Sequence, residues 1–389
     1  MNNKIQDIEW LRGVAILLVV IHHANINLFV WSTPGLQLFY TYFGGTVGVD
    51  IFFAISGFVI AKDLLPRLER AANGELAARE IIAFWIRRVW RLLPSAWLWL
   101  AIILFLVVFF NSSGAFGGFR TNFEATVAAV LQVANFRLAE AFGRFEYGAS
   151  AVYWSLSLEE QFYLIFPLAA ILLRKYLIFL VMALALWQLF SVRSGLDMFA
   201  ICFRTDALCL GVMLAIFSNN GYYAIFNPMF LRCRLVSAGL VFVLLMCILA
   251  LGSNALHIVN IRLSLIALIS ALLVWIASFN AGYLSNFSSP LQPAMLWLGS
   301  RSYAIYLIHM PAFYLTREIW FRTDAAVQGF NENFFYPFVI TAFLLIIVLS
   351  ELNYRLLEAP LRDYGKRAAL RIRDGSDGVA DMSDPVRSQ

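Results

Sequence analysis

The sequence predicts an all-α, polytopic integral membrane protein. Hydrophobic residues make up 61% of its 389 residues and charged residues 14%, and the mean hydropathy is +0.75. This composition excludes a soluble globular protein. The four cysteines lack the spacing of a zinc site or a disulfide framework. We therefore expect no metal and no permanently bound cofactor.

Ten apolar runs are candidate membrane-spanning helices. They cover residues 8–30, 46–62, 84–110, 152–173, 176–192, 204–218, 235–252, 258–278, 296–316 and 335–353. No small-residue cleavage site follows the first run, so we expect a retained helix rather than a signal peptide. Residues 1–361 are expected to form one transmembrane domain.

Basic residues predict the orientation of these spans. The segment after the second span and the start of the third carry Lys62, Arg67, Arg70, Arg79, Arg87, Arg88 and Arg91. Placing the N-terminus inside puts this segment in the cytoplasm, together with a basic, disordered tail at 362–389. We therefore expect both termini to lie on the cytoplasmic side of the cell inner membrane. The same bias explains the net charge of +5, so no nucleic-acid partner is expected.

The longest outer segment lies at residues 111–151. It opens with NSSGAFGGF, a flexible, turn-rich stretch. The following TNFEATVAAVLQVANF predicts a short amphipathic helix, capped by Thr121 or Asn122.

Arg12 and His23 are the first candidates for chemistry. They are eleven residues apart in the first span, which places them on one helix face, separated by about 16 Å along the axis. Ionisable groups at this depth are costly and indicate a function. A neutral His23 can act as general base toward a hydroxyl. The alternative is a histidine that only forms a hydrogen bond between helices.

Asp50 lies at membrane depth in GTVGVDIFFAISGF. It can orient an imidazole, or it can pair with Arg12 or another arginine, and the sequence does not separate these alternatives. Arg204 and Asp206, at the outer end of the sixth span, are expected to form an ion pair. The glycines around Asp50 permit close helix approach: Gly44, Gly45, Gly48 and Gly57.

Three arginines cluster in FWIRRVWRLLP, where Arg87, Arg88 and Arg91 lie three or four residues apart. Planar, bidentate guanidiniums suit phosphate groups. The alternative is membrane anchoring and contact with anionic lipids. Arg91 and Pro94 lie deeper in the span than anchoring requires, which favours a soluble, phosphorylated donor.

The fourth span opens with YWSLSLEEQFYLIFPL, in which Ser155 and Glu159 are one helical turn apart. Two adjacent glutamates, Glu159 and Glu160, are costly on entering an apolar helix unless they are paired or functional. Helix capping by Ser155 or Ser157, with a favourable helix dipole, is the alternative.

The ninth span contains GSRSYAIYLIHMP, in which Ser302, Tyr306 and His309 fall on one helix face. This face either lines the same cavity as the preceding motifs or forms a buried, hydrogen-bonded stripe.

Together these motifs resemble the acyltransferase-3 family of integral membrane O-acyltransferases. The resemblance runs from about Ile8 to Leu361 and rests on five motifs in order. They are R-x10-H (Arg12 to His23), GVDIFFAISGF, R-x-x-R in RRVWRLLP (Arg88, Arg91), S-x-x-x-E in WSLSLEEQFY (Ser155, Glu159), and SYAIYLIH. Members transfer acetyl or other short acyl groups, typically from cytoplasmic acyl-CoA, to glycans of the cell envelope, and some modify small molecules. Many carry a C-terminal esterase-like domain, so this chain resembles the stand-alone type.

The resemblance implies roles for individual residues. It makes His23 the catalytic histidine and Glu159 essential, with Glu160 as its neighbour. It also implies that Arg12, Arg88 and Arg91 serve the CoA moiety or hold the site.

The resulting hypothesis is transfer of acetyl, or another short acyl group, from acyl-CoA to a sugar hydroxyl of a lipid-linked or envelope glycan. His23 either deprotonates that hydroxyl or briefly carries the acyl group. One alternative is an acyltransferase with a small-molecule acceptor. Another is a proton-coupled secondary transporter with His23, Asp50 and Glu159 as a proton relay, although paired broken helices are not evident. The acceptor, the length of the acyl group and the oligomeric state stay open.

Overall fold

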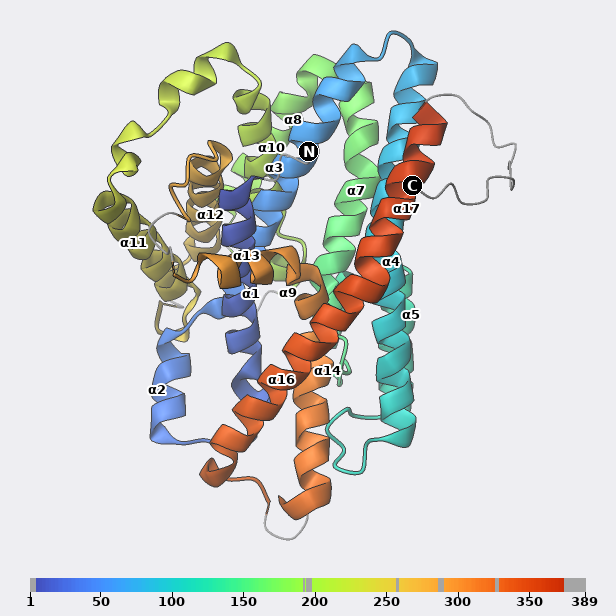
Figure 1. Cartoon of the computed structure of the whole chain (residues 1–389), viewed down its shortest axis with the longest axis vertical. Helices are drawn as coiled ribbons and strands as arrows, with labels where there is room; N and C mark the ends of the chain where they lie inside the picture. The colour runs from blue at the N-terminus through green and yellow to red at the C-terminus, as the bar shows by residue number, and fades with distance from the viewer. Residues whose placement is uncertain are drawn as a thin grey trace, which may run out of the picture.

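The computed structural model of this protein describes residues 5–191, 193, 198–256, 259–285, 290–325 and 329–373. Within these ranges the chain is a bundle of helices (Figure 1), and its one β feature there is an isolated bridge between Asn25 and Phe29. The predicted all-α, polytopic membrane fold is confirmed.

The bounds of the elements are as follows. The longer helices are α1 (Gln6–Asn27), α3 (Gly48–Arg70), α4 (Gly74–Phe109), α7 (Tyr153–Leu173), α8 (Leu177–Phe190), α10 (Asp206–Ser218), α11 (Arg234–Gly252), α12 (Arg262–Ser278), α14 (Ser302–Trp320), α16 (Phe335–Asn353) and α17 (Ala359–Arg373). The shorter ones are α2 (Pro34–Tyr42), α5 (Phe119–Val130), α6 (Ala134–Ala141), α9 (Met198–Cys202) and α13 (Gln292–Ser300). Single turns are η1 (Gly45–Val47), η2 (Arg174–Tyr176), η3 (Gly221–Phe226), η4 (Met229–Arg232), η5 (Asn254–Leu256), η7 (Phe321–Ala325), η8 (Glu332–Phe334) and η9 (Tyr354–Glu358).

Six helical stretches of the described chain are long and apolar enough to cross a membrane. They are Pro34–Arg70, Gly74–Phe109, Tyr153–Phe190, Met198–Ser218, Arg234–Gly252 and Glu332–Arg373. The expected spans 8–30, 258–278 and 296–316 lie outside these six, although each coincides with helix: α1, α12, and α13 with α14. The number ten therefore stays a prediction.

Helix α1 occupies the centre of the bundle and contacts α3, α12, α13 and α14. Leu11, Ala15 and Ile16 are fully buried, whereas Leu17 and Ile21 are more than one third exposed. One face of α1 therefore packs into the core, while Leu17 and Ile21 on another face line an apolar groove shared with α2 and α16. In Figure 1 the α3–α4 turn lies at the upper end of the molecule, and α2 and the end of α14 lie at the lower end.

The backbone of α1 leaves helical geometry at Asn25, two residues after His23. Asn25 has φ −58° and ψ 133°, and Ile26 has φ 58° and ψ −24°. A positive φ is rare for a β-branched residue because its Cβ crowds the backbone, and such strain clusters at functional sites. The expected span 8–30 therefore ends as a helix at Asn27, and the break lies beside the histidine.

Glycines bring α3 and α10 into backbone contact. A Cβ atom on Gly57 would lie 2.1 Å from the carbonyl oxygen of Leu208, and one on Gly211 would lie 2.2 Å from that of Ala54. No side chain fits at either position. The close approach predicted from the glycines around Asp50 is therefore confirmed, as small-residue packing in membranes allows.

Three segments differ from the sequence prediction. The outer amphipathic segment forms two helices, α5 and α6, and α5 begins at Phe119, so that neither Thr121 nor Asn122 is its cap. The span 296–316 is divided at Arg301 between α13 and α14. Residues 362–373 of the expected disordered tail are helical, because the small Gly365 of α17 lets that helix pack on Trp90 of α4. Residues 374–389 lie outside the described part of the chain.

Candidate active site between two cavities

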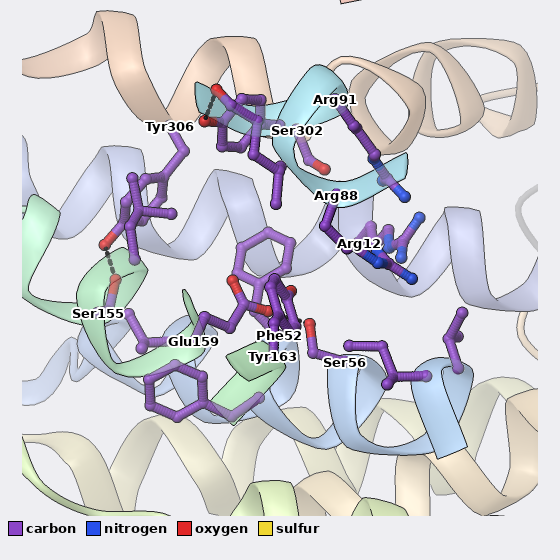
Figure 2. Close-up of a pocket in the computed structure, with 17 residues that line it drawn as sticks. Arg12, Phe52, Ser56, Arg88, Arg91, Ser155, Glu159, Tyr163, Ser302 and Tyr306 are labelled. Carbon is purple, nitrogen blue, oxygen red and sulfur yellow. Dashed lines mark hydrogen bonds between the residues drawn. The ribbon is translucent and has the colours of Figure 1, made fainter. Parts of the chain in front are cut away.

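A cavity of about 720 Å³ opens among α1, α3, α4, α7 and α14 (Figure 2). We call it the arginine cavity. Its polar lining consists of Arg12, Ser56, Arg88, Arg91, Ser155, Glu159, Tyr163, Ser302, Tyr303 and Tyr306. Figure 2 shows its arginines at one end and the hydrogen bond between Ser155 and Tyr306 at the other, with Glu159 between them.

The arginines of this cavity are held in different ways. Arg12 forms an ion pair with Glu9, one turn earlier on α1, at 2.8 Å. The guanidinium carbon of Arg88 lies 5.3 Å from the ring centroid of Tyr163. The Nε atom of Arg91 is buried without a hydrogen-bond partner among the described residues. Because an unsatisfied buried donor is costly, this end of the cavity suits an anionic ligand.

Arg87 does not line the arginine cavity. Its Nη2 atom lies 3.5 Å from a carboxylate oxygen of Asp63 on α3. Glu160 is also absent from the lining, although Glu159 is part of it. Of the predicted arginine cluster and glutamate pair, the structure thus brings Arg88, Arg91 and Glu159 into one cavity.

Two hydrogen bonds fix the other polar groups of the arginine cavity. The hydroxyl of Ser56 donates to Glu159, which ties α3 to α7. The hydroxyls of Ser155 and Tyr306 are 2.6 Å apart, which ties α7 to α14. Ser56 was not singled out in the sequence, where one serine among the apolar residues of a span carries no distinguishing signal.

The imidazoles of His23 and His309 form a hydrogen bond between α1 and α14. Nδ1 of His23 lies 2.9 Å from Nε2 of His309, and the two ring planes are within 17° of parallel, with centroids 5.1 Å apart. His309 is fully buried. Its Nδ1 atom lies 3.2 Å from the carbonyl oxygen of Ile305.

The hydrogen-bond partners determine the tautomers of this pair. The Ile305 carbonyl can only accept, so Nδ1 of a neutral His309 carries the proton and Nε2 has the lone pair. Nδ1 of His23 must then donate to that lone pair. This leaves Nε2 of His23 unprotonated, which is the form a general base requires.

A second cavity, of about 830 Å³, is lined by His23 of the histidine pair. We call it the aromatic cavity. Its lining includes His23, Asn27, Phe116, Glu146, Tyr147, Trp154 and Tyr314. The Tyr314 hydroxyl donates to the Asn27 side chain at 2.9 Å, and Asn27 donates to the carbonyl of His23 at 2.8 Å. These bonds hold the broken end of α1 against α14.

The loop 111–118 forms one wall of the aromatic cavity and is tied down by a carboxylate. The amides of Ser112 and Ser113 donate to Glu318 at 2.8 and 2.7 Å, and Arg322 donates to the same carboxylate at 2.6 Å. The Asn111 side chain closes the loop by bonding its backbone. The stretch expected to be flexible is therefore hydrogen-bonded to the end of α14.

A layer one side chain thick separates the two cavities. Tyr306 lines the arginine cavity, and its hydroxyl donates at 3.0 Å to the carbonyl of Val152, which lines the aromatic cavity. His309 packs beside Tyr306, with ring centroids 5.7 Å apart. Arg12 and His23 were expected to belong to one site. They instead open into different cavities, because each cavity meets a different end of α1.

The comparison with protein families identifies the family of this chain. A family model described as an acyltransferase domain matches residues 5–352. The chain belongs to the acyltransferase-3 family. The family predicted from the five motifs is thereby confirmed.

Several named relatives resemble this acyltransferase-3 protein. The peptidoglycan O-acetyltransferase OatA of Listeria monocytogenes is 28% identical over 385 residues, which cover 93% of this chain and 56% of the relative. The putative peptidoglycan O-acetyltransferase YrhL of Bacillus subtilis is 28% identical, covering 95% and 57%. A putative O-acetyltransferase of Staphylococcus aureus, SACOL0978, is 27% identical, covering 94% and 58%. The chain thus spans a little over half the length of these curated relatives. No solved structure matches it.

Asp50 contacts neither histidine of this acyltransferase-3 protein. It pairs with Arg204, whose Nε lies 2.8 Å from Oδ1. The expected pair of Arg204 with Asp206 is wrong, because Asp206 is bound by Arg193 at 2.5 Å. All four side chains are buried. Of the two sequence alternatives for Asp50, the structure therefore shows the ion pair, with Arg204 rather than Arg12 as its partner.

Other residues of the site were not identified from the sequence. Trp154 lines the aromatic cavity and lies beneath the guanidinium of Arg204, 5.2 Å from Cζ to its ring. Tyr314 and Asn27 hold the end of α1. The one available signal was the polar pair Asn25 and Asn27, which follows the histidines in an apolar span.

Proposed function

We propose that this protein is an O-acetyltransferase of the cell inner membrane, which transfers acetyl from cytoplasmic acyl-CoA to a sugar hydroxyl of a cell-envelope or exported glycan. The observation that carries this proposal is the hydrogen-bonded pair of His23 and His309: His23 lines the aromatic cavity, and His309 packs beside Tyr306 of the arginine cavity, which the donor thioester has to pass to reach His23. A transfer reaction needs two substrates to meet at one base, and this geometry supplies a separate approach for each.

The arginine cavity suits the donor. CoA carries several phosphates on one end and a thioester on an extended arm. The guanidiniums of Arg12, Arg88 and Arg91 lie at one end of the cavity (Figure 2), and planar donors of this kind bind phosphate bidentately. The arm would then run past Glu159 toward Tyr306, whose ring packs beside that of His309. The positive-inside rule places the arginine end in the cytoplasm.

The aromatic cavity suits a saccharide acceptor. Its lining combines the rings of Phe116, Tyr147, Trp154 and Tyr314 with the polar side chains of Asn27 and Glu146. Sugar rings present C–H faces that pack on aromatic rings, while their hydroxyls need a few placed hydrogen-bond partners. OatA and YrhL, whose names describe peptidoglycan O-acetylation, support a glycan of the envelope over a small-molecule acceptor.

The proposed reaction follows from the tautomers. Nε2 of His23 takes the proton of the acceptor hydroxyl as its oxygen attacks the thioester carbonyl. The C–S bond breaks, and the thiolate of CoA leaves with the proton from His23. His309 holds the His23 ring through Nδ1 and stabilises the imidazolium that forms transiently, while the products are an acetyl ester and free CoA.

The deciding experiment compares His23→Ala with a matched variant, His22→Ala, in purified protein reconstituted in nanodiscs. Labelled acetyl-CoA and an envelope glycan fraction are supplied, and acetyl ester formation is measured by mass spectrometry. We expect no ester with His23→Ala and near-normal ester with His22→Ala, because the hydrogen bond that orients His23 comes from His309, whereas the His22 ring meets the His23 ring only edge-on, with centroids 5.7 Å apart. Ester formation by folded His23→Ala protein would refute the proposal. Proton-coupled uptake without any acyl transfer would favour a transporter.

A further inference from the structure

A second cation-rich pocket lies at the α3–α4 end of the molecule, outside the arginine cavity. It encloses about 510 Å³. Its charged lining is Arg67 and Arg70 of α3, Arg79 and Glu80 of α4, and Arg373 of α17. We call it the α3–α4 pocket. The hydrogen bond from Arg373 to Glu80 spans 293 residues of sequence, so tertiary packing, rather than one local basic run, brings these guanidiniums together.

The α3–α4 pocket has an excess of positive charge. Glu80 is the one carboxylate in its described lining, and it is shared by Arg373 at 2.6 Å and Arg67 at 4.0 Å. Arg79 is paired with Glu75, whose side chain is 71% exposed. Arg70 donates to the backbone carbonyl of Pro66. Four guanidiniums therefore face one pocket, and the carboxylates that pair with them are Glu80, Glu75 and Asp63, so that Arg70 has no carboxylate partner among the described residues.

One carboxylate links an arginine of this pocket to Arg87, the residue that precedes Arg88 of the arginine cavity. Asp63 binds Arg67 at 2.5 Å through Oδ1 and Arg87 at 3.5 Å through Oδ2. Arg87 immediately precedes Arg88, which lines the arginine cavity. In addition, Glu80 and Arg87 are seven residues apart on α4 and therefore share one face of that helix. The two cation clusters are adjacent but distinct.

We propose that the α3–α4 pocket binds a phosphate group of the donor substrate. This inference rests on the proposed function and assigns to the pocket the ribose 3′-phosphate of CoA. CoA carries that phosphate monoester apart from the 5′-diphosphate, so it offers two anionic groups to two clusters. The diphosphate lies at Arg88 and Arg91, and the 3′-phosphate lies among Arg67, Arg70 and Arg79, whose bidentate donors suit a dianion.

The test compares CoA with 3′-dephospho-CoA, which lacks only this phosphate. Affinities are measured by calorimetry with full-length protein in nanodiscs of neutral lipid. The wild type is expected to bind CoA about tenfold more tightly, as one charge-assisted contact provides. In Arg70→Gln/Arg79→Gln the preference is expected to vanish while the affinity for 3′-dephospho-CoA is unchanged. These two arginines bind exposed or backbone partners, so their loss leaves the fold intact.

The matched control is Arg232→Gln/Arg234→Gln, which removes two exposed arginines before and at the start of α11. This control must keep the tenfold preference for CoA over 3′-dephospho-CoA. It removes as much positive charge as Arg70→Gln/Arg79→Gln does, on the same expected side of the membrane. Equal binding of both compounds by the wild type would overturn the inference. In that case the thermal midpoint is measured with phosphatidylglycerol added to the nanodiscs. A midpoint that rises in the wild type but not in Arg70→Gln/Arg79→Gln would assign the pocket to a lipid headgroup. If neither compound bound the wild type at all, the donor of the proposed function would be wrong as well.

Discussion

At the scale of single residues, the tautomer of His23 depends on a backbone carbonyl one helix away. Ile305 accepts from His309, His309 accepts from His23, and the lone pair is left on Nε2 of His23, the nitrogen that we propose reacts. In the proposed reaction His309 is a positioning residue, because it would act through His23 rather than on the substrate.

We expect His309→Ala to lower kcat for acyl transfer by about a hundredfold or more, the range by which general base catalysis contributes. Nδ1 of His23 then has no acceptor, and the productive tautomer is no longer selected. KM for acetyl-CoA is expected to stay the same, because His309 does not line the arginine cavity. Steady-state kinetics at several pH values check this, with the thermal midpoint as the folding control. A variant that altered KM alone would contradict the role given to His309.

Glu318 supplies a second prediction at this scale. Burial opposes its ionisation, but hydrogen bonds from the Ser113 hydroxyl and amide, from Arg322 and from the Ser112 amide outweigh burial and lower the pKa of Glu318 to about 2. A lowered pKa means that this contact stabilises the fold above the ordinary pKa of about 4.3. The stabilisation is lost as the pH falls through about 2.

The loop 111–118 should therefore stay docked at pH 5, and Glu318→Gln should release it at every pH. The amides of Ser112 and Ser113 now donate to different oxygens of the Glu318 carboxylate, whereas the glutamine side chain offers one oxygen and no charge. We expect the loss of this charged acceptor to destabilise the docked loop by about 2 kcal/mol. Hydrogen exchange at the amides of Ser112 and Ser113 measures the release, and KM for the acceptor should rise. Unchanged protection of both amides in the variant would show that the carboxylate does not hold the loop.

At the scale of elements, glycines decide how closely helices pack and therefore where Asp50 meets Arg204. The backbones of α3 and α10 touch at Gly57 and Gly211. This approach places Asp50, at the start of α3, against the arginine that precedes α10. Burying that ion pair is tolerated because each charge has a partner; removal of one partner would leave an uncompensated charge.

Gly57→Ala is expected to destabilise the protein by about 2 kcal/mol, since a methyl group there overlaps the Leu208 carbonyl and the helices must separate. The thermal midpoint in detergent measures the effect. Gly239→Ala in α11 is the matched control, because a Cβ atom at that position meets nothing within 4 Å. Equal midpoints for the two variants would mean that the α3–α10 contact is not limiting for stability.

At the scale of the whole molecule, the arrangement predicts access from opposite sides of the membrane. The arginine-rich α3–α4 end and the loop 111–118 lie at opposite ends of the bundle (Figure 1). A donor and an acceptor that approach from different compartments can then meet at His23 without either crossing the bilayer.

This prediction is tested with single cysteines in a background that lacks the four native ones. Glu146→Cys lies in the lining of the aromatic cavity and Arg79→Cys in that of the α3–α4 pocket. A membrane-impermeant thiol reagent added outside cells should label position 146 at once and position 79 only after permeabilisation. The reverse pattern would invert the orientation that the basic residues predict.

The sequence by itself determined the class of fold, the family and most of the motif residues. Hydropathy and the spacing of charges along a helix are local properties, so the apolar helices and the helix faces that carry Arg12, His23 and the arginine cluster follow from residue order alone. The same locality explains why the helical stretch 362–373 was missed: its polar sequence becomes a helix because it packs on α4.

Only the tertiary structure decided which residues meet. His309 is 286 residues from His23, and Asp50 is 154 from Arg204. Nothing along the chain distinguishes these partners from Arg12 or Asp206, because a buried charge or imidazole can be satisfied by any group that packing brings within hydrogen-bond distance. The separation of Arg12 and His23 into two cavities has the same origin, because the two ends of one face of α1 contact different residues of the neighbouring helices.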